Sequence, residues 1–120
     1  MALDLKETEQ DGVLVIKLSG VLDAGSRDAL RDRLAEFTRA KDTPKAVMDM
    51  GELDYISSVG WSVFVENAAE MNDKRGGLKF ACMRKNMDRL FQLMGINAQI
   101  ESYAGVEQAV KSFSNPDKGG

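Results

Sequence analysis

Residues 46–61 read AVMDMGELDYISSVGW, and this stretch decides the fold. It opens on a short apolar run that is typical of a buried β-strand, which we expect over residues 45–50. It closes on two serines and a glycine at the start of a long helical pattern over residues 58–74. A strand that passes directly into a helix is the repeating unit of an α/β fold.

Ser57 and Ser58 stand together at this strand-to-helix junction. One serine there is explained as an N-cap, because its oxygen accepts a hydrogen bond from a free backbone N–H. The second hydroxyl lies in the first helical turn, where we expect it to point away from the strand. Gly60 carries no side chain, which would let the backbone of a partner come close. The pair therefore has two interpretations, a cap alone or a cap beside a hydroxyl presented to another protein.

The remaining elements follow from hydrophobic periodicity and turn residues. Asp11-Gly12 is a strong hairpin signal between the first two strands. Leu30, Leu34 and Phe37 define one helical face, with Asp23 or Ser26 as its cap. Together with residues 45–50 and 58–74, we expect strands over 2–10, 13–20, 78–83 and 98–104, and helices within 21–42, 86–95 and 105–113.

This order predicts an α/β domain in which four helices pack on a mixed β-sheet of about five strands. The first two strands form an antiparallel hairpin, and the later strands are parallel with right-handed crossovers. The expected core includes Cys82 and one face of the helix over 86–95, formed by Met87, Leu90, Phe91 and Met94, with Gly95 ending that helix. We expect one domain over residues 1–113 and a flexible C-terminal tail over 114–120.

Composition narrows the function further. The 120 residues carry a net charge of −3, so the chain lacks the basic footprint of a protein that binds nucleic acid or an anionic membrane. There is no histidine, which excludes Ser-His-Asp, Cys-His and HExxH sites. We expect no catalytic residues, no metal site and no cofactor. A single cysteine and the lack of a signal peptide favour the reducing cytoplasm.

The chain resembles the STAS domain family, and in particular the bacterial anti-sigma factor antagonists. Three motifs carry the resemblance: GVLDAGSRDAL (20–30), AVMDMGELDYISSVGW (46–61) and NMDRLFQLMGI (86–96). In that family a serine or threonine two residues before the turn glycine accepts a phosphate, and Ser58 has this position here. Ser57 is the second choice. Val59, where the family often has serine, threonine or alanine, is a mild departure, as is Trp61 in place of leucine.

The resemblance implies a partner-switching cycle. The unphosphorylated domain would bind an anti-sigma factor that is also a serine kinase, and so release a sigma factor. Phosphorylation of Ser58 would end this binding, and a metal-dependent serine phosphatase of the PPM type would restore it. ATP and Mg²⁺ belong to those partners. The expected partner-binding residues are Asp23, Asp54, Tyr55, Ser57, Ser58, Gly60 and Trp61.

Several alternatives stay open at this point. Asp23 is either an N-cap or part of the partner-facing rim, or both. Trp61 is either an exposed interface anchor or a core residue. The whole chain could instead be a constitutive STAS scaffold, a subunit of a transporter or of a signalling assembly, in which Ser58 is never phosphorylated. A small-molecule enzyme is disfavoured by the missing histidine, metal ligands and nucleotide loops.

Overall fold

The computed structural model describes residues 2–114. Its order of elements is β1 (Leu3–Gln10), β2 (Val13–Leu22), α1 (Arg27–Ala40), β3 (Lys45–Ile56), α2 (Ser58–Asp73), β4 (Gly77–Ala81), α3 (Lys85–Leu93), the 3₁₀ turn η1 (Ile96–Ala98), β5 (Ser102–Tyr103) and α4 (Val106–Ser112). The described strands form one sheet in the order β1-β2-β3-β4-β5, antiparallel between β1 and β2 and parallel elsewhere. The predicted five-stranded mixed sheet with four α-helices is confirmed.

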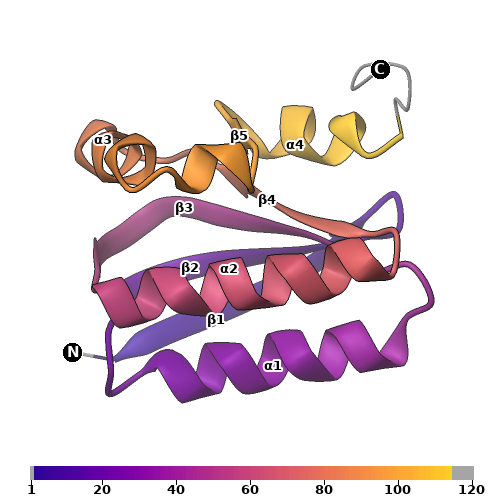
Figure 1. Ribbon diagram of the computed structural model, residues 1–120, viewed down its shortest axis with the longest axis horizontal. Coiled ribbons are helices and arrows are strands. Elements are labelled where there is room, and N and C mark those ends of the chain that lie inside the picture. Colours follow the sequence, from indigo (N-terminus) through magenta and orange to yellow (C-terminus); the bar gives the residue numbers. More distant parts are fainter. Residues whose placement is uncertain (1, 115–120) are drawn as a thin grey trace.

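Helices cover both faces of the sheet (Figure 1). The two long helices α1 and α2 lie side by side below it, and the larger hydrophobic core fills the space between them and the sheet. Met87 and Phe91 of α3 also belong to this core. On the opposite face, Ala109 and Val110 of α4 cover a smaller cluster.

The β1–β2 turn follows the sequence prediction closely. Gln10 pairs with Val13, so the loop contains only Asp11 and Gly12. Both residues have positive φ, 52° and 80°, as a type I′ turn requires.

Two strands differ from their predicted bounds by more than two residues. β3 continues six residues beyond the predicted end at Met50, because its second half pairs with the end of β2 after two register shifts. Leu53 and Ile56 are buried there, although Gly51 and Glu52 made this segment read as a loop. The strand predicted over 98–104 contains only Ser102–Tyr103, because η1 extends to Ala98 and residues 99–101 form a turn that leads into β5.

The prediction of a single core face on α3 was wrong in part. Met87 and Phe91 are buried, but Leu90 and Met94 are each 47% exposed. Only one narrow stripe of this helix meets the core. Gly95 follows the helix in the left-handed conformation, φ 75°, as expected for a glycine that ends a helix. The predicted tail lies outside the described residues except for Ser114.

Candidate functional site: the strand-to-helix junction at Ser57 and Ser58

Ser57 is the N-cap of α2. Its backbone is extended, and its hydroxyl oxygen accepts a hydrogen bond from the N–H of Gly60 at 3.2 Å. Its own N–H donates to the carbonyl oxygen of Leu22 at 2.9 Å. The side chain is half-buried. Ser57 therefore holds the end of β2, the end of β3 and the start of α2 together.

Ser58 is the first residue of α2, and its side chain is exposed. Within residues 2–114 its hydroxyl has no hydrogen-bond partner. Its carbonyl oxygen accepts a bond from the hydroxyl of Ser62 at 3.2 Å. The two serines thus divide the roles, with the oxygen of Ser57 engaged in the cap and that of Ser58 open to solvent.

Gly60 is required by packing inside the domain. A Cβ atom at this position would lie 2.8 Å from Cγ of Leu22 and 2.9 Å from Cγ2 of Ile56. The expectation that this glycine opens space for a partner backbone is therefore corrected, because the space belongs to β2 and β3. Close approach of α2 to the sheet is the physical reason.

Trp61 is a core residue, only 2% exposed. Its ring stacks on Phe91 at 6.2 Å and meets Phe64 and Phe80 edge-on at 6.3 and 5.9 Å. The interpretation as an exposed interface anchor is corrected in favour of the core interpretation. The aromatic cluster links the first turn of α2 to α3, which explains why the indole turns inward.

Asp23 lies beside the serine junction, because β2 and β3 run parallel with Leu22 opposite Ile56. Its carboxylate accepts hydrogen bonds from the N–H groups of Gly25 and Ser26 at 3.0 and 3.2 Å. Ser26 occupies the N-cap position of α1 but its side chain caps nothing and bonds to the carbonyl of Val21 instead. Asp23 shapes the loop before α1 and remains partly accessible.

Asp54 and Tyr55 lie near the end of β3 and have exposed side chains, that of Tyr55 being 56% exposed. Arg84, at the N-cap of α3, lies 3.5 Å from the carboxylate of Asp54 through Nη1 and donates from Nε to the carbonyl of Gly51. Arg84 was not among the predicted site residues, and no local pattern in the sequence marks it. The structure brings it to this end of the sheet by the turn that follows β4.

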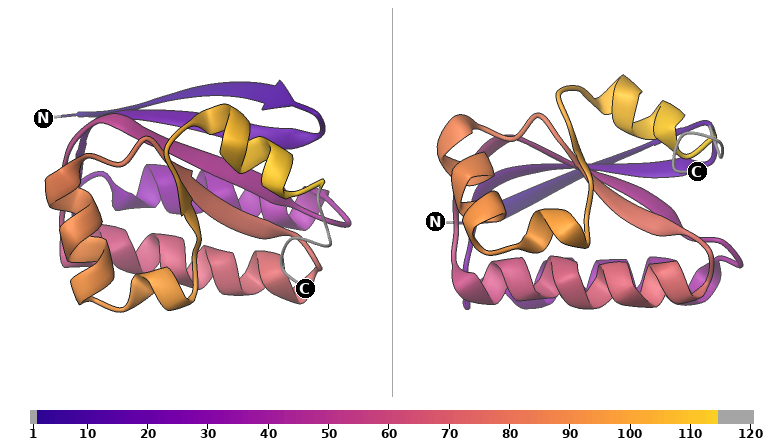
Figure 2. Two further views of the ribbon diagram at one scale, coloured as in Figure 1. Left: turned by 90° about the horizontal axis from the view of Figure 1, so that it is seen from above. Right: turned by 45° about the horizontal axis from the view of Figure 1, so that its top comes forward.

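One end of the molecule therefore gathers five of the predicted residues, Asp23, Asp54, Tyr55, Ser57 and Ser58, which we call the acceptor face. The first turn of α2 and the whole of α3 lie toward this end (Figures 1 and 2). The large apolar side chains that are exposed on α3 are Leu90, Leu93 and Met94. An exposed hydroxyl toward the same end of the molecule as exposed apolar side chains suits a protein-binding surface.

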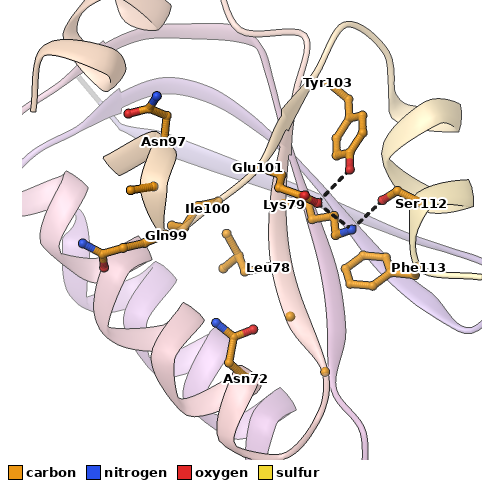
Figure 3. Close-up of a pocket in the computed structure, with 13 residues that line it drawn as sticks. Asn72, Leu78, Lys79, Asn97, Gln99, Ile100, Glu101, Tyr103, Ser112 and Phe113 are labelled. Carbon is orange, nitrogen blue, oxygen red and sulfur yellow. Dashed lines mark hydrogen bonds and ion pairs between the residues drawn. The ribbon is translucent and has the colours of Figure 1, made fainter. Parts of the chain in front are cut away.

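A cavity of about 550 Å³ lies elsewhere, near the C-terminal end of α2 (Figure 3). Lys79 lines this cavity, but its ammonium group already has partners. Nζ of Lys79 donates to Oγ of Ser112 at 2.7 Å and pairs with the carboxylate of Glu101 at 3.0 Å. The ring of Phe113 covers the same ammonium group at 4.4 Å. This arrangement fixes α4 to β4 and offers no free charge to a ligand.

Other reactive groups do not form a site. Burial and the neighbouring Asp49 raise the pKa of the Cys82 thiol, which favours the less reactive protonated form. The prediction that Cys82 lies in the core holds only in part, because its side chain is half-buried at the edge of the α4 cluster. Among residues 2–114, no group of three or more histidine, cysteine, aspartate or glutamate side chains is placed to hold a metal ion.

Fold and junction together define a small α/β domain with an exposed serine at a helix start. The STAS domain model matches residues 4–109, and the chain belongs to the STAS domain family. It is 31% identical over 85 residues to BtrV of Bordetella bronchiseptica, a candidate anti-sigma factor antagonist, covering 71% of this chain and 72% of that protein. It is 26% identical to the anti-sigma-B factor antagonist of Bacillus subtilis, covering 91% and 96% of the two chains.

Solved structures agree on the fold. A candidate anti-sigma factor antagonist from Thermotoga maritima has a TM-score of 0.85 at 12% identity, covering 92% of this chain and 95% of that one. The Bacillus cell fate determinant SpoIIAA in its phosphorylated form has a TM-score of 0.72 at 18% identity, covering 92% and 97%. The curated relatives place the chain in the anti-sigma factor antagonist family, which is not a family of enzymes. None of the helices within residues 2–114 has the length and apolar character to cross a membrane.

Proposed function

We propose that this protein is an anti-sigma factor antagonist that works by partner switching, with Ser58 as the phosphoacceptor. In the unphosphorylated state it binds an anti-sigma factor that is also a serine kinase, and the sigma factor is released. Phosphorylation of Ser58 ends the binding, and a PPM-type phosphatase reverses it. The names of the relatives support the first partner, and the exposed, unbonded hydroxyl of Ser58 is the observation that carries the proposal.

The backbone around Ser58 favours a phosphate. The N–H of Gly60 is taken by the cap, whereas those of Ser58 and Val59 have no partner within the described chain. Free N–H groups and the positive end of the helix dipole both stabilise an anion. The modification is therefore compatible with the folded domain, and its effect falls on the partner.

A docked partner would meet a very different surface after phosphorylation. The phosphate adds about −1.5 to −2 charges at neutral pH. The acceptor face already carries the carboxylates of Asp23 and Asp54, of which only Asp54 pairs with Arg84, so the partner must desolvate the added negative charge. We expect the exposed apolar residues of α3 to contribute to binding only while Ser58 is unphosphorylated.

Ser58 is favoured over Ser57 for a geometric reason. The Ser57 oxygen already accepts a bond from Gly60 and is half-buried, so a kinase would first have to open the helix cap. Ser58 requires no such change. We place the cycle in the cytoplasm, where a kinase and ATP are present.

Intact-mass measurement after incubation with the anti-sigma kinase and ATP tests the assignment. We expect one added phosphate in the natural protein and in the Ser62→Ala control, and none in Ser58→Ala. Uptake that persists in Ser58→Ala and is lost in Ser57→Ala would move the site by one residue. No uptake at all would favour the constitutive scaffold.

Binding gives a second readout. Ser58→Asp should weaken the complex with the kinase, while Ser58→Asn, of similar size but neutral, should weaken it much less. Equal loss in both variants would mean that shape, and not charge, controls release.

A further inference from the structure

β1 forms an open edge of the sheet. It pairs with β2 alone, and no element of the described chain lies beyond it (Figure 2, left). The strand runs for eight residues, Leu3–Gln10, and six of them are exposed. Such an edge presents unpaired N–H and C=O groups that can pair with another strand.

The hairpin fixes which groups point outward. The residues that flank a two-residue turn form a hydrogen-bonded pair, so Gln10 and Val13 exchange bonds across the hairpin. Hydrogen-bonded and non-hydrogen-bonded pairs then alternate along the strands. It follows that Leu3, Leu5, Glu7 and Glu9 direct their N–H and C=O groups away from β2.

We propose that this edge is the contact surface for a second copy of the chain, in an antiparallel β1–β1 pairing with Leu5 on the two-fold axis. In this register Leu5 faces Leu5 of the second copy, and Leu3 faces Glu7. Asp4 faces Lys6, and by symmetry Lys6 faces Asp4. Two cross-strand ion pairs therefore flank an apolar contact, and each stabilises the pairing.

Charge selects this register over its neighbours. Only pairings that bring outward-facing residues together are possible, which restricts the two-fold axis to the position of a residue. An axis at Lys6 places two lysines opposite each other, and axes at Asp4 or Glu7 place two carboxylates opposite each other. Like charges in direct opposition are destabilising, so Leu5 is the favoured axis position.

The side chains on the other face of β1 leave its edge accessible for this contact. Glu7 is held on the helix side by Arg33, with Oε2 2.6 Å from Nε, so its side chain does not obstruct the edge. Leu3 and Leu5 are half-buried against the core and leave part of their apolar surface uncovered. The acceptor hydroxyl of Ser58 lies beyond β3, two strands away, and stays open in the dimer. The proposal does not depend on phosphorylation.

Sedimentation equilibrium over a concentration series up to about 1 mM tests the dimer. We expect a monomer–dimer equilibrium for the natural protein. Lys6→Glu should raise the dissociation constant about tenfold or more, because two attractive pairs become repulsive. Asp4→Lys combined with Lys6→Asp restores opposite charges and should restore the dimer. Glu9→Lys is the matched control, since Glu9 lies outside the paired stretch.

A disulfide test reads the register directly. Residues in a hydrogen-bonded antiparallel pair have Cα atoms about 5.5 Å apart, within the range that a disulfide spans. In a Cys82→Ser background, Leu5→Cys should therefore give a covalent dimer on mild oxidation, and Glu9→Cys should not.

Three results would overturn the proposal. The first is a natural protein that remains monomeric at the highest concentration. The second is a dimer that Lys6→Glu leaves unchanged, and the third is equal cross-linking through Leu5→Cys and Glu9→Cys.

Discussion

The carbonyl oxygen of Leu22 accepts a hydrogen bond from the N–H of Ser57 at 2.9 Å. This bond joins the carboxyl ends of two parallel strands at the point where α2 begins. It places the loop of Asp23 beside the serine pair, although 33 residues of chain separate Asp23 from Ser57. The acceptor face therefore depends on the contact between β2 and β3 as much as on the serines themselves.

Gly60→Ala should destabilise the domain by about 1–3 kcal/mol, because the added methyl group overlaps Leu22 and Ile56. Urea unfolding, followed by the fluorescence of the single tryptophan, measures the loss. Gly25→Ala is the control at the same end of the molecule, since its nearest contact would be an Asp23 oxygen at 3.5 Å. Equal stability of the two variants would contradict the tight packing of α2 on the sheet.

Alanine substitutions of the two serines should lower the free energy of unfolding by different amounts. Ser57→Ala removes the N-cap of α2 and should cost about 1 kcal/mol. Ser58→Ala removes an exposed hydroxyl without a partner and should change the free energy of unfolding by less than about 0.5 kcal/mol. A larger loss for Ser58→Ala than for Ser57→Ala would mean that the cap has been assigned to the wrong residue.

Lys79→Met should lower the free energy of unfolding by about 1–2 kcal/mol, since the ammonium group bonds to Ser112 and lies over the Phe113 ring. Lys111→Met, on the exposed side of α4, should change it by less than about 0.5 kcal/mol. Phosphorylation of Ser58 should be unaffected in both variants, because Lys79 lies away from the acceptor face.

Stability should depend on pH through Glu7. Its hydrogen bond with Arg33 lowers the pKa of this carboxyl below its ordinary value of 4.5. A carboxyl whose pKa is lower in the folded state stabilises the fold above that ordinary value, and this stabilisation is lost as pH falls through the folded-state pKa. The pair is about one-third exposed, so we expect less than about 1 kcal/mol.

The comparison of the natural protein with Glu7→Gln in chemical denaturation at pH 7 and at about pH 3 measures this contribution. The difference between the two proteins should be larger at pH 7. Glu9→Gln on the same strand serves as the control. A difference that is independent of pH would show that the ion pair contributes nothing.

Local sequence signals predicted the elements whose geometry is set within a few residues. The Asp11-Gly12 turn was predicted because an I′ turn needs two residues that tolerate positive φ. The start of α2 was predicted because a serine at the junction can accept a bond from an N–H three residues ahead. The order of strands and helices follows from the same kind of local information.

Side-chain burial was harder to predict where two elements compete to cover a residue. Helical spacing places Leu90 and Met94 on the same predicted face as Phe91. Only Phe91, however, packs against the aromatic cluster around Trp61, while Leu90 and Met94 are exposed. Likewise, Gly51 and Glu52 read as a loop and lie in a strand, because β2 continues beside them. No local pattern contains the position of the neighbouring element.

The sequence by itself determined the α/β class, the strand-to-helix junction and the pair of hydroxyls placed there, since each depends on backbone preferences over a few residues. Only the tertiary structure decided that Trp61 and Gly60 pack in the interior, that Asp23 lies beside the serines and Arg84 beside Asp54, and that the Ser58 hydroxyl stays in solvent. The reason is that burial is a property of surfaces brought together by the fold, and those surfaces come from segments far apart along the chain.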